Sequence, residues 1–239
     1  MKTSLRTRIG AEFLGTAFLL MIIVGSGIMG ERLSGGNVAI ALLANSLATG
    51  CGLYVLISAL APVSGAHLNP IVTLAEAWLG RVSRGEAAVY IASHFVGAYT
   101  GVAAANLMFE LPAFSLSQHA RHGRGQLFGE FVATFGLIAV IQLCGRFQPR
   151  SVPIAVAAYI TAAYWFTAST SFANPAVSLG RSATDTFAGI RLTDVPGFVA
   201  AQLLGASAAT GLFFRMLPAS RRATDDFRLT AQQENPQAD

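Results

Sequence analysis

Two short stretches of the chain join a helix-capping amide to a proline, and each opens an apolar segment. They are Asn69-Pro70-Ile71 and Asn174-Pro175-Ala176. Asn is a preferred helix N-cap because its side-chain oxygen accepts hydrogen bonds from free backbone N–H groups, and Pro suits the first helical position because its missing N–H had no partner there. With both oxygens used for capping, the amide N–H groups are expected to stay free. Two facing helix N-termini with free donors predict a site that repels cations and favours uncharged hydrogen-bonding molecules.

Two carboxylates, Glu12 and Glu130, lie within apolar stretches. Buried carboxylates in membrane segments are costly and usually functional. One interpretation is proton coupling in a secondary transporter. The other is a structural role.

His67 stands two residues before Asn69. Its imidazole, with an ordinary pKa of about 6.5, could sense pH or serve as a neutral structural group. No pairing of a nucleophile with a base, no metal-ligand spacing and no phosphate loop appears in the sequence. We therefore predict no enzyme activity, no metal and no cofactor.

The elements that must position these residues are predicted to be membrane-spanning helices. The 239-residue chain is 53% hydrophobic and 12% charged, whereas soluble domains carry about 25% charged residues. A span needs about 20 mostly apolar residues. Six stretches meet this, of which the fifth is short: 9–29, 38–60, 87–109, 127–145, 152–170 and 195–217. The predicted fold class is an all-α membrane protein.

The same order of features occurs twice along the chain. Ala11-Glu12-Phe13 in the first span is echoed by Gly129-Glu130-Phe131 in the fourth, and an Asn-Pro turn follows the second and the fifth spans. Three spans in each copy predict an inverted repeat, with copies at about 9–109 and 127–217. Each Asn-Pro segment, about 11 residues or ~16 Å of helix, is too short to cross ~30 Å of hydrocarbon. The two are expected to be re-entrant half-helices that meet near the midplane.

The net charge of +4 does not indicate a nucleic-acid partner, because the positive residues gather between the spans. Most of them fall on the side that holds both termini, which predicts cytoplasmic termini. Residues 1–218 are expected to form the channel-like domain. The polar stretch 219–239 is expected to be a disordered cytoplasmic tail.

These motifs resemble those of the aquaporin and glycerol-facilitator family, the major intrinsic proteins, over nearly all of residues 8–217. The matching pieces are 11–16, 64–73, Glu130 with Ala133-Thr134-Phe135, and Asn174-Pro175-Ala176. The resemblance implies an aquaporin-like fold with six spans and two half-helices, in a homotetramer with one passive pore per subunit, in the lipid bilayer of the plasma or inner membrane. It favours a scaffold role for Glu12 and Glu130, in which each carboxylate accepts hydrogen bonds from the irregular backbone before a half-helix. It also favours a neutral role for His67 at the inner pore mouth.

The sequence departs from the family pattern at the position after the second Asn-Pro-Ala, where Val177 replaces the usual Arg. The resemblance places the selectivity filter at Thr49, Ala162, Ser171 and Val177. All four are small, and the guanidinium with its five donors is missing. We therefore expect a wide pore with weaker repulsion of cations at the filter.

Two further departures concern Arg181 and Ile71. Arg181 lies one helical turn after Val177. It is expected either to supply charge to the outer vestibule or to be an interfacial residue that the helix dipole favours. Ile71 replaces the Ala that is usual in the first turn, and is expected to narrow the cytoplasmic side of the midplane.

Family members without the filter Arg include plant vacuolar channels for water, urea and hydrogen peroxide, and bacterial channels associated with arsenic resistance. The run Asn-Pro-Ala-Val-Ser-Leu-Gly-Arg and the short outer loops resemble the bacterial group more. The resulting prediction is a passive channel for small uncharged solutes, namely metalloid hydroxides such as arsenite, glycerol and urea, together with water. The alternatives are a water or peroxide pore, and a proton-coupled transporter that uses Glu12 and Glu130.

Overall fold

The computed structural model describes residues 3–217, and within this range the chain is all-helical. The predicted tail, 219–239, lies outside the described residues. Two single-turn 3-10 helices, Pro149–Ser151 and Leu192–Asp194, precede α6 and α8. The α-helices are α1 Leu5–Leu33, α2 Val38–Ser64, α3 Pro70–Trp78, α4 Arg84–Met108, α5 Arg124–Phe147, α6 Val152–Phe166, α7 Pro175–Arg181 and α8 Val195–Met216.

Five helical segments in the described range are long and apolar enough to cross a membrane. They are α1, α2, α4, α5 and the segment Leu192–Met216, which includes α8. The fifth predicted span, 152–170, is wrong at its end, because α6 stops at Phe166 after 15 residues. Thr167 is extended, and the chain from there to Asn174 is the irregular lead into α7. Residues 167–170, which hydropathy assigned to a span, therefore belong to the segment that leads into the half-helix α7.

The long helices pack in the same way in the two halves of the chain. Helix α1 packs chiefly on α4, and α5 chiefly on α8. A Cβ atom on Gly97 of α4 would collide with the carbonyl oxygen of Phe13 in α1, and one on Gly205 of α8 with that of Phe131 in α5. Glycine at these two crossings lets the backbones approach closely, as is usual where lipid provides no hydrophobic drive for helix association.

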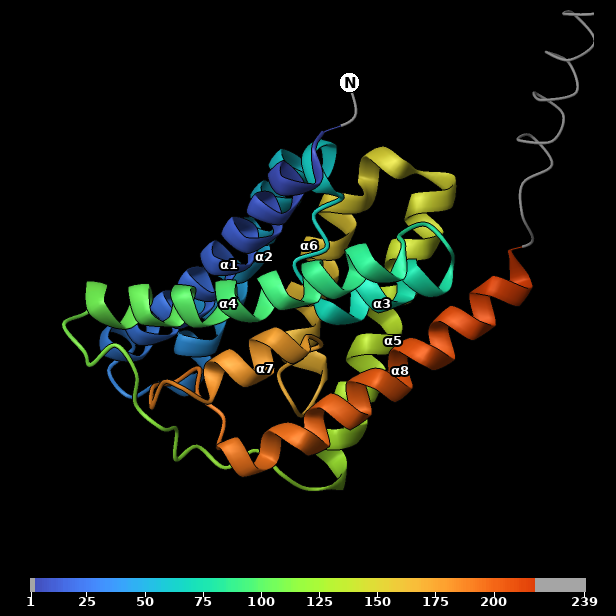
Figure 1. Cartoon of the computed structure of the whole chain (residues 1–239). Helices are drawn as coiled ribbons and strands as arrows, with labels where there is room; N and C mark the ends of the chain where they lie inside the picture. The colour runs from blue at the N-terminus through green and yellow to red at the C-terminus, as the bar shows by residue number, and fades with distance from the viewer. Residues whose placement is uncertain (1–2, 218–239) are drawn as a thin grey trace, which may run out of the picture.

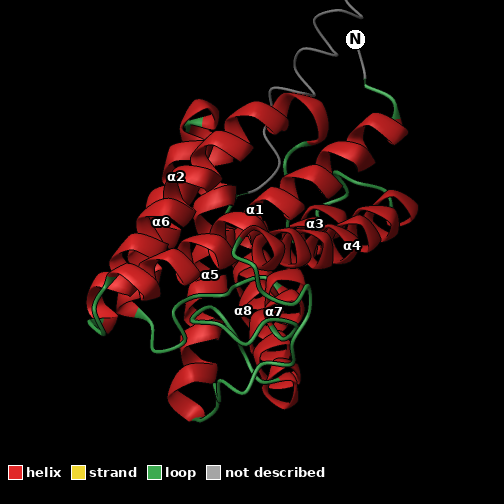
Figure 2. Ribbon diagram, turned by 90° about the vertical axis from the view of Figure 1, so that its left-hand side faces the viewer, coloured by secondary structure: helices red, strands yellow, loops and turns green. Residues whose placement is uncertain are grey.

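The short helices α3 and α7 lie at the centre of the bundle, with α1 and α2 toward the upper left and α5 and α8 toward the right in Figure 1. Figure 2 shows α2 and α6 side by side, and the longer loops gathered at the opposite end from the N-terminus. Two of these loops are joined by backbone hydrogen bonds from Ser115 to Ala183 and from Ser117 to Ser182, both 3.0 Å. This arrangement fixes the loop after α4 beside the loop after α7.

Candidate functional site

The two half-helices begin at the predicted caps. The Asn69 Oδ1 atom accepts a hydrogen bond from the Ile71 N–H at 2.9 Å, and the Asn174 Oδ1 atom accepts from the N–H groups of Ala176 and Val177 at 3.0 and 3.3 Å. Pro70 and Pro175 take the first helical positions. Helices α3 and α7 contact each other, so two helix N-termini meet inside the bundle.

The amide groups of these two asparagines are not both free, which corrects the expectation from the sequence. Asn69 Nδ2 donates to the carbonyl oxygen of Ala173 at 2.8 Å, and Asn174 Nδ2 donates to that of Leu68 at 2.9 Å. Each amide carries two hydrogens, so one hydrogen of each joins the two half-helix entries and the second remains. This reciprocal bridge holds the two helix starts together and leaves one donor on each side chain for a solute.

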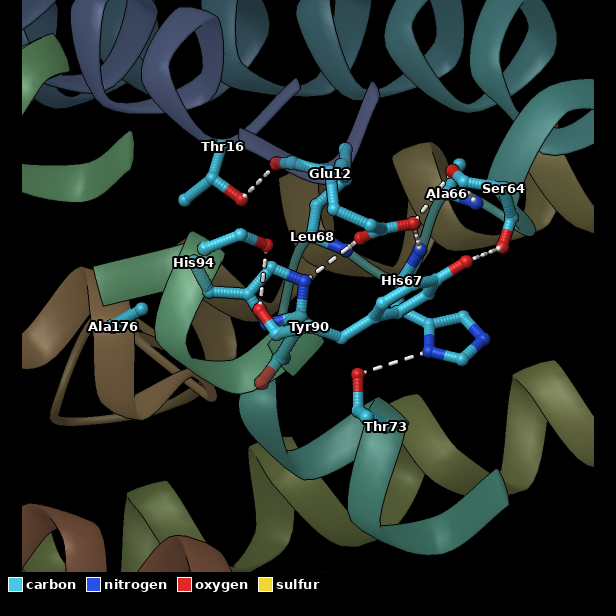
Figure 3. Close-up of polar contacts among 12 residues, drawn as sticks. Glu12, Thr16, Ser64, Ala66, His67, Leu68, Thr73, Tyr90, His94 and Ala176 are labelled. Carbon is cyan, nitrogen blue, oxygen red and sulfur yellow. Dashed lines mark hydrogen bonds and ion pairs between the residues drawn. The ribbon is translucent and has the colours of Figure 1, made fainter. Parts of the chain in front are cut away.

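Glu12 lies against the loop that leads into α3, and Figure 3 shows its surroundings. Its carboxylate accepts hydrogen bonds from the backbone N–H groups of His67 and Leu68 at 3.0 and 2.7 Å, and from the Ser64 hydroxyl at 2.6 Å. The His94 ring nitrogen Nε2 lies 2.8 Å from the same carboxylate. Leu68 has a φ of 49°, an uncommon conformation for a residue other than glycine, so the carboxylate holds strained backbone in place.

Glu130 occupies the corresponding place against the loop that leads into α7. Its carboxylate accepts from the backbone N–H groups of Phe172 and Ala173 at 2.8 and 2.9 Å, and from Gln202 Nε2 at 2.5 Å. Both glutamates are fully buried, and neither lines the cavity described below. This geometry favours the scaffold interpretation over proton coupling along a solute path.

A cavity of about 300 Å³ runs beside the two asparagines, and both line it. Its wall is largely apolar, with side chains such as Leu53, Leu137 and Ile160 from three different helices. His67, Glu76 and Arg81 also line it, and Arg81 Nη1 bonds Glu76 at 2.9 and 3.2 Å. A mostly apolar wall with a few polar groups suits small uncharged solutes that carry hydroxyl or amide groups.

Three of the four filter residues expected from the sequence lie together at this cavity. Thr49, Ser171 and Val177 all line it and are buried. The Ser171 hydroxyl has no hydrogen-bond partner within residues 3–217. A buried hydroxyl without a partner is costly, so a passing solute or water can bond it favourably.

Ala162, the fourth expected filter residue, is misplaced. It is exposed and does not line the cavity. The face of α6 that does so is Val152, Val156, Ile160 and Tyr164. Residues four apart share one helix face, whereas Ala162 is two residues, or about 200°, from Tyr164 and Ile160. Counting back from Asn174 predicted the wrong face of α6 for the cavity, because no motif fixes the alignment of this helix. The repeat of apolar residues at every fourth position could have indicated the correct face.

Tyr164 adds a hydroxyl beside Thr49, since its oxygen lies 3.2 Å from Thr49 Oγ1. Tyr164→Leu should raise glycerol permeability relative to water by roughly threefold, because it withdraws the ring end and its hydroxyl from the cavity wall. Ala162→Leu is the matched control, and it should change neither the glycerol permeability nor the water permeability. Stopped-flow light scattering of proteoliposomes measures both permeabilities. If Ala162→Leu blocks glycerol permeation and Tyr164→Leu has no effect, the filter residue on α6 is Ala162 and not Tyr164.

Arg181 is buried and does not lie in an open vestibule, and it stands in the last turn of α7, where the helix dipole favours a cation. Its side chain is 2% exposed, and its guanidinium carbon lies 3.4 Å from the centroid of the Phe172 ring. Its Nε atom donates to the Ala188 carbonyl. The loop after α7 folds over the arginine and takes it out of solvent.

Of Ile71 and His67, only His67 lines the cavity. Ile71 is fully buried but does not line the cavity, because it packs into a cluster with Ile138 and Ala209. The expectation that its bulk narrows the path is therefore wrong. His67 does line the cavity, and its Nδ1 atom lies 2.9 Å from Thr73 Oγ1. This bond holds the imidazole against the first turn of α3 at the end of the cavity.

Comparisons with known proteins agree with this arrangement. The model of the family described as "Major intrinsic protein" matches residues 1–146. A Rhizobium meliloti protein described as aquaglyceroporin AqpS is 51% identical over 217 residues, which are 91% of this chain and 93% of that protein. A probable TIP-type aquaporin of Medicago truncatula is 32% identical over 185 residues, covering 71% of this chain and 72% of its own. The X-ray structure of the aquaglyceroporin from Plasmodium falciparum shares the fold, with a TM-score of 0.69 and 20% identity over 90% of this chain and 97% of that one.

Proposed function

Because the chain belongs to the major intrinsic protein family, whose members are multi-pass membrane channels and not enzymes, we propose that it conducts small uncharged solutes passively through a wide filter. The solutes are metalloid hydroxides such as arsenite, in the form As(OH)3, together with glycerol, urea and water. The name of the Rhizobium meliloti relative supports a glycerol-conducting channel. The absence of the filter Arg extends the proposal to larger solutes.

The observation that carries the proposal is the composition of the cavity wall on the α7 side of the asparagines. Thr49, Tyr164, Ser171 and Val177 line it there, and none of them carries a permanent charge. Hydroxyl groups of Thr49, Tyr164 and Ser171 replace the donors that a guanidinium would offer. A molecule with several hydroxyl groups, such as glycerol or As(OH)3, can exchange hydrogen bonds with this wall as it passes.

The second candidate function is a pore for water or hydrogen peroxide alone. The bond between Thr49 and Tyr164 supports it, because this bond uses one of the two O–H donors and leaves fewer donors for a larger solute. A proton-coupled transporter has less support. Each carboxylate accepts hydrogen bonds from two backbone N–H groups, and neither Glu12 nor Glu130 lines the cavity.

We also propose that the protein is a homotetramer in the plasma or inner membrane with both termini in the cytoplasm. Large apolar side chains exposed on the helices support burial of the outer surface against lipid and neighbouring subunits; examples are Phe18, Leu47, Val96 and Leu204. The excess of arginine on the side of the termini supports the orientation.

Uptake by wild-type proteoliposomes tests the function. Glycerol, urea and arsenite should each enter at least roughly tenfold faster than into empty liposomes, because the wide filter offers them a path that lipid does not. Uptake should stop at equal concentrations inside and outside, with or without a pH gradient. Stopped-flow light scattering measures the first two solutes, and elemental analysis of arsenic measures the third. Passage of water alone would favour the second candidate, and accumulation driven by a pH gradient would favour a transporter.

A further inference from the structure

Two guanidinium groups lie against one aromatic ring of the cavity wall. Phe172 lines the cavity and is buried. The guanidinium carbon of Arg181, from α7, lies 3.4 Å from its ring centroid, and that of Arg121, from the loop after α4, lies 5.1 Å away. Both distances are within the range of a cation–π interaction. Neither arginine lines the cavity itself, so each positive charge is separated from the solute path by this ring.

The contacts of Arg121 leave its charge without a negative partner. Its Nε atom donates to the carbonyl oxygen of Gly189 at 2.8 Å, and its Nη1 and Nη2 atoms donate to the Thr170 hydroxyl and the Phe187 carbonyl, both at 3.4 Å. All three acceptors are neutral. Burial lowers the pKa of Arg121 from its ordinary value, but a guanidinium remains charged in proteins.

Arg181 is equally uncompensated. Its Nε atom donates to the neutral Ala188 carbonyl, and its Nη1 atom has no partner among the described residues. Within residues 3–217, no carboxylate forms an ion pair with either arginine. Asp194 is paired with Arg191 at 3.0 Å and accepts from the backbone N–H of Arg121 at 2.8 Å, not from its guanidinium. The Glu130 carboxylate is bound by the α7 entry loop and attracts both guanidinium groups through space without an ion pair to either. Two positive charges that lack ion-pair partners therefore stand beside the cavity.

We propose that Arg121 and Arg181, acting through Phe172, form the electrostatic barrier that excludes cations on the α7 side of this channel. The inference rests on the proposed function, because a barrier to ions matters only where neutral solutes pass. A buried charge acts strongly over a short distance in a poorly polarisable medium, and it repels a cation without affecting a neutral molecule. Since the ring covers the guanidinium groups, they provide this field without narrowing the path. The arrangement reconciles a wide filter with exclusion of ions.

The first experiment removes the charges in full-length protein. In proteoliposomes, the double variant Arg121→Met/Arg181→Met should raise proton and potassium leak at least tenfold, while glycerol permeability stays within twofold of wild type. Arg181→Lys, which keeps the charge, should leak like wild type. Arg32→Met is the matched control, because Arg32 also lies over a ring, Phe109 at 5.2 Å, but this ring does not line the cavity. Wild-type leak in the double variant, with glycerol permeability preserved, would overturn the proposal.

A second pair of variants covers the case in which removal of a buried arginine prevents folding. Thr170 has a φ of 60°, and its hydroxyl accepts from Arg121 Nη1. Asp and Asn both tolerate this backbone conformation better than Thr. Thr170→Asp should neutralise Arg121 and raise ion leak severalfold, whereas the isosteric Thr170→Asn should not. Equal ion leak in these two variants would also overturn the proposal that the arginines form the barrier. A wild-type protein that passes neither glycerol nor water would instead overturn the proposed function.

Discussion

Replacing Val177 with arginine should close the channel to glycerol and urea while water still passes. Val177 is buried in the cavity wall beside Ser171, so a longer side chain must extend into the path. The unpartnered Ser171 hydroxyl can accept a hydrogen bond from the new guanidinium and hold it there. We expect a fall of at least roughly tenfold in glycerol and urea permeability, with water permeability within about threefold, because a narrower polar filter still admits single waters.

Stopped-flow light scattering on matched proteoliposomes, with arsenite uptake read in parallel, measures this change. Val177→Met is the control for bulk without charge, and it should reduce glycerol permeability less than arginine does. Arsenite should follow glycerol rather than water. If Val177→Arg leaves all permeabilities unchanged, the constriction lies elsewhere along the cavity and the wide-filter interpretation is wrong.

Glu130→Gln should destabilise the protein strongly and abolish conduction with it. Three donors converge on this carboxylate, from Phe172, Ala173 and Gln202. An amide at position 130 keeps one acceptor oxygen and turns two hydrogens toward these donors. Since a hydrogen bond to a charged group is worth about 1.5–3 kcal/mol, we expect the midpoint of thermal unfolding in detergent to fall by roughly 5–10 °C.

Glu31→Gln provides the control, because Glu31 is exposed near the end of α1. It should unfold at the wild-type temperature and conduct normally. The same experiment separates a scaffold from a transporter. A Glu130→Gln protein that unfolds like wild type, and has lost only accumulation driven by a pH gradient, would establish proton coupling.

The local chemistry of the chain was sufficient to predict the elements that build the site. Hydropathy located the long helices because lipid selects continuous apolar surface, and Asn-Pro located the starts of α3 and α7 because capping depends on adjacent residues alone. The roles of Glu12 and Glu130 followed from the family resemblance, and the hydrogen bonds to the two entry loops agree with them. Membership of the channel family was likewise predicted from motifs alone, and it is confirmed.

What the tertiary structure decided is how each element is turned and what covers it. The rotation of α6, which exposes Ala162 and places Tyr164 in the cavity, depends on packing against α2 and α5. The amides of Asn69 and Asn174 are bound by carbonyls more than a hundred residues away in the chain. Arg181 is buried because the loop after α7 folds over it, and the loop after α4 brings Arg121 to the same ring. Contacts between distant segments leave no local pattern in sequence, since they form only when the helices pack.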